Sequence, residues 1–132
     1  MGIFSISCSN SDKTGSTIDD SKGIEQYNGN SYVSTQSFTI QQSTIYLWVS
    51  VKDGQVAMDA NDNNTTEPTY QGYFSVTGYG TDYSFSTDYY GEQNAVVGTL
   101  KFTDTSVTVK YTKNPGAPQE MLNKDIVCNK KQ

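Results

Sequence analysis

The fold is decided by a short stretch near the middle of the chain, Ser50-Val51-Lys52-Asp53-Gly54-Gln55-Val56. Asp-Gly is a preferred pair at the centre of a type I′ turn, which joins two antiparallel strands with a two-residue loop. Side chains alternate between the faces of a strand, so the correct turn must bring apolar residues together on one face. A turn at Asp53-Gly54 does this for Val51 with Val56, Val49 with Met58, and Leu47 with Ala60.

Three more turns pass the same test and predict further hairpins, and a fourth, at Asn28-Gly29, suggests another. The three lie at Gln42-Ser43, Tyr79-Gly80 and Asp104-Thr105. The apolar pairs that the four turns predict are Ile24 with Val33, Ile40 with Ile45, Phe38 with Leu47, Val76 with Tyr83, Phe74 with Phe85, Phe102 with Val107, and Leu100 with Val109. A slip of one residue would turn each set outward, so the pairs also predict the registers.

The alternation predicts eight strands, and no stretch shows a helical period over three turns. The strands are expected at residues 24–27, 31–41, 44–52, 55–60, 69–77, 82–88, 95–103 and 106–112, with a ninth short piece at 125–128 that would close the sheet. One helical turn is expected at 118–123. Consecutive hairpins predict an all-β fold: an eight-stranded antiparallel meander that closes into a small barrel, because closure removes exposed edges. An open β-sandwich is the alternative. This strand order resembles that of lipocalin-like small barrels, and the resemblance is one of fold alone.

Composition excludes several classes of function. The 132-residue chain has a formal charge of -5 and contains no His, and all of its basic residues are Lys. Nucleic acid is therefore not an expected partner, because binding phosphates needs clustered positive charge, usually with Arg. Catalysis by a His base and phosphate binding by an Arg clamp have no residues to use. We expect a protein that is not an enzyme and needs no cofactor.

The N-terminal residues predict that the protein is exported. The sequence Ile6-Ser7-Cys8 resembles the end of a bacterial lipoprotein signal, in which a small residue precedes a cysteine that becomes lipid-modified. The resemblance implies that residues 1–8 are a signal-peptide remnant, that Cys8 carries the lipid, and that the protein lies in the bacterial cell envelope or at its surface. A disulfide between Cys8 and Cys128, or an unreactive thiol at Cys8, is the alternative.

The remaining chain divides by composition. Residues 9–23 contain one aliphatic residue, Ile18, so they are expected to form a flexible polar tether. Residues 24–128 are expected to form a single β domain, followed by a tail at 129–132. A polar spacer between a lipid and a folded domain agrees with the anchored interpretation, in which the lipid is the protein's only contact with a membrane.

Acidic and tyrosine residues share one part of the chain. Seven acids and no Lys lie between positions 53 and 92: Asp53, Asp59, Asp62, Glu67, Asp82, Asp88 and Glu92. Exposed tyrosines suit binding sites because they lose little rotamer entropy and offer both apolar area and a hydroxyl. We therefore predict that acidic, Tyr-rich loops bind a cationic protein, either a host protein or a cell-wall enzyme. The predicted contact residues are Tyr79, Asp82, Asp88, Tyr89 and Tyr90.

Three other functions stay open. The interior could carry a small apolar ligand, as lipocalins do, between the inward residues Phe38, Leu47, Met58, Phe74, Phe85, Leu100 and Phe102. Tyr46 and Trp48 alternate outward and could form a stacking platform for carbohydrate, provided that Trp48 is exposed. The last alternative is a structural surface domain.

A metal site is not expected. Asp59, Asn61 and Asn63 place oxygen ligands at alternate positions, which makes them a weak candidate for Ca²⁺. The calcium-loop pattern then fails, because Asn64 stands where Gly is needed and Tyr70 stands where the bidentate Glu belongs. A solvated loop between strands is the favoured interpretation.

Overall fold

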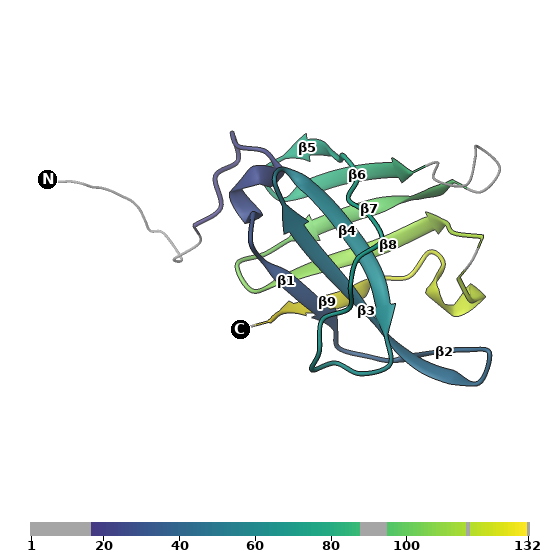
Figure 1. The fold of residues 1–132 in the computed structure, drawn as a ribbon. Coiled ribbons are helices and arrows are strands. Elements are labelled where there is room, and N and C mark those ends of the chain that lie inside the picture. The colour runs from purple at the N-terminus through teal and green to yellow at the C-terminus, as the bar shows by residue number, and fades with distance from the viewer. Residues whose placement is uncertain (1–16, 88–94, 116, 132) are drawn as a thin grey trace, which may run out of the picture.

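The protein is all-β, and its strands form a nine-stranded antiparallel sheet (Figure 1). The structure is a computed structural model, and it describes residues 17–87, 95–115 and 117–131. The elements are η1 (Ile24–Tyr27), β1 (Ser31–Ser34), β2 (Phe38–Ile40), β3 (Ser43–Lys52), β4 (Gln55–Asn61), β5 (Thr77–Tyr79), β6 (Asp82–Thr87), β7 (Val96–Phe102), β8 (Ser106–Lys113), η3 (Gln119–Met121) and β9 (Ile126–Lys130).

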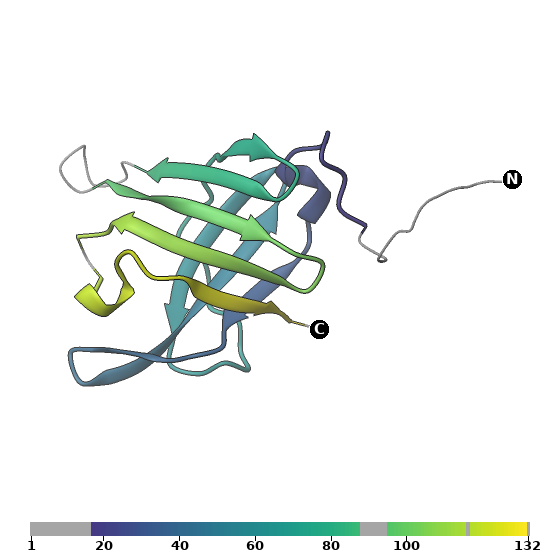
Figure 2. The ribbon, with the colours of Figure 1, turned by 180° about the vertical axis from the view of Figure 1, so that it is seen from behind.

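The sheet runs in the order β2-β3-β1-β9-β8-β7-β6-β5, and β4 pairs with the other edge of β3. β9 lies between β8 and β1, so the expected short C-terminal strand joins the two halves of the sheet. Figures 1 and 2 show β1, β3 and β4 crossing over β6, β7 and β8 as a second layer. Apolar residues from both layers belong to one core cluster, so the core lies between them.

The predicted barrel closure is wrong, because the sheet is open between β4 and β5. In the described part of the chain, this seam is bridged by one isolated pair, in which Val56 and Phe74 exchange two backbone hydrogen bonds of 2.9 and 2.8 Å. The strand predicted at 69–77 does not form along its length, and only Thr77–Tyr79 is regular. Gly72 lies within this segment and weakens a strand. Its neighbour Tyr73 bonds Ser50 through its hydroxyl instead of extending a ladder. The open sheet agrees with the alternative prediction.

The registers of two predicted hairpins are confirmed. Asp53-Gly54 forms the turn between β3 and β4, and Val51 pairs with Val56 as predicted. Asp104-Thr105 forms the turn between β7 and β8, with Phe102 opposite Val107. In both cases the tightest turn and the best apolar pairing agree, so only one register satisfies both.

Two other registers differ from the prediction. Gln41 and Gln42 both adopt positive φ, at 51° and 70°, so they form the turn and Phe38 pairs with Ile45 instead of Leu47. The next turn moves to Gly80-Thr81, which pairs Gly78 with Tyr83. Gly78 has a φ of 145°, and a Cβ there would lie 2.2 Å from the Asp82 carbonyl oxygen, so this approach requires Gly.

The hairpin predicted at Asn28-Gly29 is wrong, because residues 24–27 form a 3₁₀ turn. Side chains three residues apart lie on the same side of a 3₁₀ helix, so Ile24 and Tyr27 both enter the core from η1. The predicted strand alternation could not bury both residues on one face. The helical turn predicted at 118–123 is present as η3, where Met121 is buried.

Both ends of the folded domain extend beyond the predicted limits. Residues 17–23, which we call the N-terminal strap, were expected in the flexible tether but are bonded to the domain, for example through Gly80 N–H to Lys22 O at 2.8 Å. The expected tail begins inside β9, and Lys131 N–H donates to Ser31 O at 2.7 Å. Backbone hydrogen bonds thus order these two mainly polar stretches, and in the strap Ile18 also packs against the core.

Candidate functional site

The most exposed large hydrophobic side chain among the described residues lies next to the turn between β5 and β6. Tyr79 is 71% exposed, and its direct partner across the turn is Asp82. Both residues were predicted to contact a partner, and the structure brings them together. The other three predicted contact residues, Asp88, Tyr89 and Tyr90, lie outside the described residues.

This turn is held from below by two buried tyrosines. The Gly80 carbonyl oxygen accepts hydrogen bonds from the Tyr27 hydroxyl at 2.5 Å and the Tyr83 hydroxyl at 2.9 Å. Burial raises the pKa of both phenols, so each remains a proton donor at neutral pH. Because Gly80 N–H is also bonded to the strap, the backbone beside Tyr79 is constrained on both sides.

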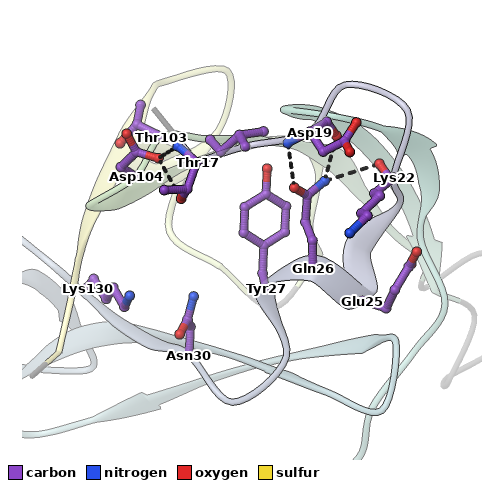
Figure 3. A pocket seen from close by; sticks show the side chains of 11 residues that line it. Thr17, Asp19, Lys22, Glu25, Gln26, Tyr27, Asn30, Thr103, Asp104 and Lys130 are labelled. Carbon is purple, nitrogen blue, oxygen red and sulfur yellow. Dashed lines mark hydrogen bonds between the residues drawn. The ribbon is translucent and has the colours of Figure 1, made fainter. Parts of the chain in front are cut away.

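The N-terminal strap forms one wall of a cleft next to this turn (Figure 3). The Gln26 side chain holds the strap, since its Oε1 accepts from Asp19 N–H at 2.9 Å and its Nε2 donates to the carbonyls of Asp19 and Lys22 at 3.1 Å. Asp104 bonds the first described residue, Thr17, at 3.2 Å. The cleft has a volume of about 610 Å³, and the Tyr27 side chain is among those that line it.

Acidic side chains gather around this cleft and turn. Asp19, Glu25 and Asp104 line the cleft, and Asp20 lies against Gly80, with its Oδ1 3.0 Å from where a Cβ would stand. Hydrogen bonds from the Ser21 hydroxyl and N–H lower the pKa of Asp19, which keeps this carboxyl ionised.

We call this surface the acidic end and define it as Asp19, Asp20, Glu25, Tyr79, Asp82 and Asp104. Lys22 and Lys130 also line the cleft, and Lys101 pairs with Asp82 across β6 and β7. Five acids thus face three lysines, so the acidic end carries net negative charge.

The sequence prediction located only part of this surface. Asp59, Asp62 and Glu67 belong to the Lys-free stretch but lie in β4 and the connection after it, away from Tyr79. The acids that replace them come from the strap, η1 and the β7–β8 turn. The sequence signal for this surface was Ile18, the one aliphatic residue in a polar stretch. Ile18 packs against the core, and it thereby brings the adjacent Asp19 and Asp20 to this surface.

The proposed carbohydrate platform is wrong, because Trp48 is 0% exposed. Its Nε1–H donates to the Asn63 carbonyl oxygen at 3.1 Å, and Tyr46 is half-buried. Because the polypeptide covers the Trp48 ring completely, the ring cannot stack on a sugar. The outward alternation of β3 was predicted correctly, but the cover over its outer face was not.

That cover is the connection from β4 to β5, which we call the outer loop (residues 62–76). It crosses the outer face of the layer that is formed by β1, β3 and β4 (Figure 1). Side chains fasten it there: Tyr73 bonds Ser50 at 2.9 Å, and Glu67 accepts from the Ser31 hydroxyl. Burial raises the pKa of Tyr70, whose hydroxyl donates to Glu67 at 2.8 Å. The outer face of β3 is therefore a second, smaller packed surface.

The weak calcium candidate has its oxygens committed to turns. Asn63 Oδ1 accepts from Thr65 N–H and Thr66 N–H at 3.0 and 2.7 Å, and Asn61 Oδ1 accepts from Asp62 N–H. Asp59 Oδ1 accepts from Ala60 N–H at 3.0 Å. Within the described ranges, no group of three or more Cys, Asp and Glu side chains could hold a metal ion. The loop geometry therefore supports a solvated turn.

The described cysteine, Cys128, is a buried free thiol. Burial raises the pKa of Cys128 to about 12, so the thiolate needed for nucleophilic chemistry does not form at neutral pH. Cys8 lies outside the described residues.

Most residues predicted to line an apolar cavity instead fill the core. Phe102 stacks on Tyr27 at 4.0 Å between ring centroids and meets Tyr83 edge-on at 5.7 Å. Two of the predicted residues, Met58 and Phe74, behave differently and line a hollow at the open seam. The aromatic core thus packs against the acidic end, whereas Met58 and Phe74 line a hollow at the seam.

Comparison with known proteins adds no assignment: no protein-family model, curated protein or solved structure matches the chain. None of the helices in the described part is long and apolar enough to cross a membrane. The function must therefore be argued from the site itself.

Proposed function

We propose that this chain is a non-catalytic binding protein of the bacterial cell envelope whose acidic end binds a basic partner protein. The observation that carries the proposal is Tyr79, an aromatic side chain left 71% exposed on a turn that is held in place. Asp88, Tyr89 and Tyr90 remain part of the proposed contact as sequence predictions.

Restraint of the turn supports a binding role for Tyr79. Two phenol hydroxyls and the strap hold Gly80, so the residue beside it is presented by a backbone that is already ordered. A contact residue that is ordered before binding loses less conformational entropy when the partner arrives. Tyrosine is also among the residues that most often dominate binding energy at interfaces.

The charges around Tyr79 support a basic partner. Asp20 and Asp82 flank the turn, and the acids of the cleft extend the negative surface. Complementary charge at the rim of an interface speeds association and disfavours acidic competitors. Because such charges are exposed, salt screens them effectively.

The proposed anchor places this surface close to the membrane. We propose Cys8 as the lipid attachment site, on the strength of Ile6-Ser7-Cys8 and the polar residues that follow. Thr17 is bonded to the acidic end, and the nine residue steps from Cys8 to Thr17 can span at most about 30 Å. The partner would accordingly be a protein that is itself at or near the membrane surface.

The proposal is tested by capture and titration. Full-length protein on a resin is incubated with envelope extract in about 0.1 M salt, where the Debye length is about 10 Å. A captured basic protein is identified, purified and titrated by interferometry. We expect Tyr79→Ala to weaken binding about ten-fold or more, and Asp20→Asn with Asp82→Asn to slow association and reduce its salt dependence.

Matched controls come from outside the acidic end. Asp62→Asn removes an acid from the outer loop, and Tyr46→Ala removes a tyrosine from β3. Neither residue belongs to the acidic end, so neither variant should change the affinity. Equal binding by the Tyr79→Ala variant, or binding that does not weaken with salt, would contradict the proposed function. Loss of fatty-acid labelling on Cys8→Ala tests the anchor separately.

A further inference from the structure

The open seam between β4 and β5 contains a second hollow, far from the acidic end. It lies beyond the Val56–Phe74 bridge, where the edge of β4 that faces away from β3 has no partner strand in the described chain. Its lining includes Met58 of β4, Thr87 at the end of β6 and Asn114 after β8. The hollow, which we call the seam pocket, has a volume of about 430 Å³. This volume is in the range of small-molecule sites, about 300–1,000 Å³.

The wall of the seam pocket is mainly apolar and held by the core. Met58, Phe74 and Val96 are half-buried and pack against the core cluster. The Phe74 ring lies 5.4 Å from Phe85, and Tyr111 meets the same ring edge-on at 6.1 Å. Because Phe85 is buried between them, the positions of both pocket residues are set by core packing.

The hydroxyl group of Tyr111 lies at this wall, and its hydrogen-bond partner among the described residues is a weak acceptor. The residue is only 4% exposed, and the hydrogen bond that its hydroxyl makes within the described chain is to Met58 Sδ at 3.6 Å. A thioether is a weak acceptor, whereas buried hydroxyls normally have a strong one. Burial raises the pKa of Tyr111, so the phenol keeps its proton and remains a donor.

Two other buried tyrosines, Tyr27 and Tyr83, have stronger acceptors for their hydroxyl groups than Tyr111 has. Tyr27 and Tyr83 both donate to a carbonyl oxygen, at 2.5 and 2.9 Å. Tyr32, which is also buried, accepts from Asn30 Nδ2 at 3.2 Å. Of the three phenols that donate a described hydrogen bond from the core, Tyr111 is the one whose acceptor is a sulfur atom.

Asp59 limits the charge of a ligand at this site. Asp59 is one of the residues that line the pocket, and its charge is one of the causes that raise the pKa of Tyr111. A carboxylate ligand would bring a second negative charge next to Asp59, in surroundings where repulsion is poorly screened. A neutral ligand avoids this cost.

We propose that the seam pocket binds a neutral, mainly apolar small molecule whose oxygen atom accepts a hydrogen bond from Tyr111. The apolar part would cover Met58, Phe74 and Val96, and the oxygen would replace the thioether as the partner of the hydroxyl. Thr87 and Asn114 add polar groups at the rim. This site is independent of partner binding at the acidic end, because β6 separates Tyr79 from Thr87 along its length.

The test uses the full-length chain and prodan, a neutral aromatic ketone whose emission shifts to the blue on leaving water. We expect saturable binding with a blue shift. Tyr111→Phe keeps the ring and removes the donor, so it should weaken binding about five-fold. Tyr83→Phe removes the hydroxyl of another buried tyrosine, which lies next to the acidic end, and should leave the prodan affinity unchanged.

Two further arms locate the site and its charge preference. Val96→Trp fills the pocket and should abolish the blue shift, with circular dichroism confirming that this variant is folded. Undecanoate should displace prodan poorly from the natural chain and better from Asp59→Asn. No saturable shift with the natural chain, or equal affinities for the natural chain and Tyr111→Phe, overturns the proposal.

Discussion

The two ends of the sheet bury the same kinds of side chain but treat them differently. At the acidic end, Tyr27, Tyr83 and Phe102 pack together and both phenols donate to Gly80. At the seam end, Tyr111 lines a hollow, and the described hydrogen-bond partner of its hydroxyl is a thioether. Packed aromatic rings thus support an exposed contact residue at one end, whereas at the other end half-buried apolar side chains line a hollow.

The largest expected effect comes from removing one aromatic ring at each end. Phe102 is 1% exposed and touches three tyrosine rings, so Phe102→Ala should lower the free energy of unfolding by about 3–5 kcal/mol. Phe74 is half-buried at the seam, so Phe74→Ala should cost less than about 2 kcal/mol. Urea unfolding measures both, and equal losses would remove the distinction between the two ends.

Alkaline pH should destabilise both ends through their buried phenols. Tyr27 and Tyr111 have raised pKa values in the folded protein, while an unfolded tyrosine ionises near pH 10. The folded state therefore holds a proton that the unfolded state loses, so stability is unaffected below pH 10 and falls above it. Each such tyrosine contributes a loss of about 1 kcal/mol between pH 10 and pH 11.

Single Phe variants test the share of each end in that alkaline loss. Tyr27→Phe or Tyr111→Phe should each make the urea midpoint less dependent on pH in this interval. A variant with the same pH dependence as the natural chain would show that its tyrosine titrates as freely when folded as when unfolded.

At neutral pH the same two variants should differ from each other. Tyr27→Phe loses a strong hydrogen bond and leaves the Gly80 carbonyl with one donor fewer, so we expect a loss of about 1 kcal/mol. Tyr111→Phe removes a hydroxyl whose partner is a weak acceptor, so stability should change by less than about 0.5 kcal/mol. Urea midpoints at pH 7 provide the comparison, and a larger loss from Tyr111→Phe would reverse our assignment of the two ends.

The smallest effect on stability is expected at the residue that we propose to matter most for binding. Tyr79→Ala removes a side chain that is 71% exposed, so thermal unfolding should shift by less than the equivalent of about 0.5 kcal/mol. A large destabilisation would mean that Tyr79 serves the fold, and the loss of partner binding in that variant could no longer be assigned to a lost contact.

The predictability of the fold followed the strength of local signals. At Asp53-Gly54, turn chemistry and apolar pairing select the same register, and the hairpin is as predicted. At Gln41-Gln42 the turn uses two non-glycine residues with positive φ, which local preference disfavours, so the prediction placed the turn one residue late. The tertiary pairing of Phe38 with Ile45 decides this register.

The candidate sites were harder to predict because they join distant segments. Exposed Tyr79 beside Asp82 could be read from one hairpin, but Asp20 and Asp104 reach the same surface only because the strap is bonded to two turns. Burial of Trp48 had no local signal, since it depends on the outer loop folding back over β3.

By itself, the sequence determined the all-β class, the central hairpins and the absence of His and Arg chemistry, because these depend on alternation, turn preference and composition. The tertiary structure decided that the sheet stays open, which acids surround Tyr79, and that the described acceptor of the buried Tyr111 hydroxyl is a thioether. These properties depend on contacts between residues as far apart as Tyr27 and Gly80, or Met58 and Tyr111. No local pattern contains such contacts, because they form only when the two layers of the sheet close on a common core.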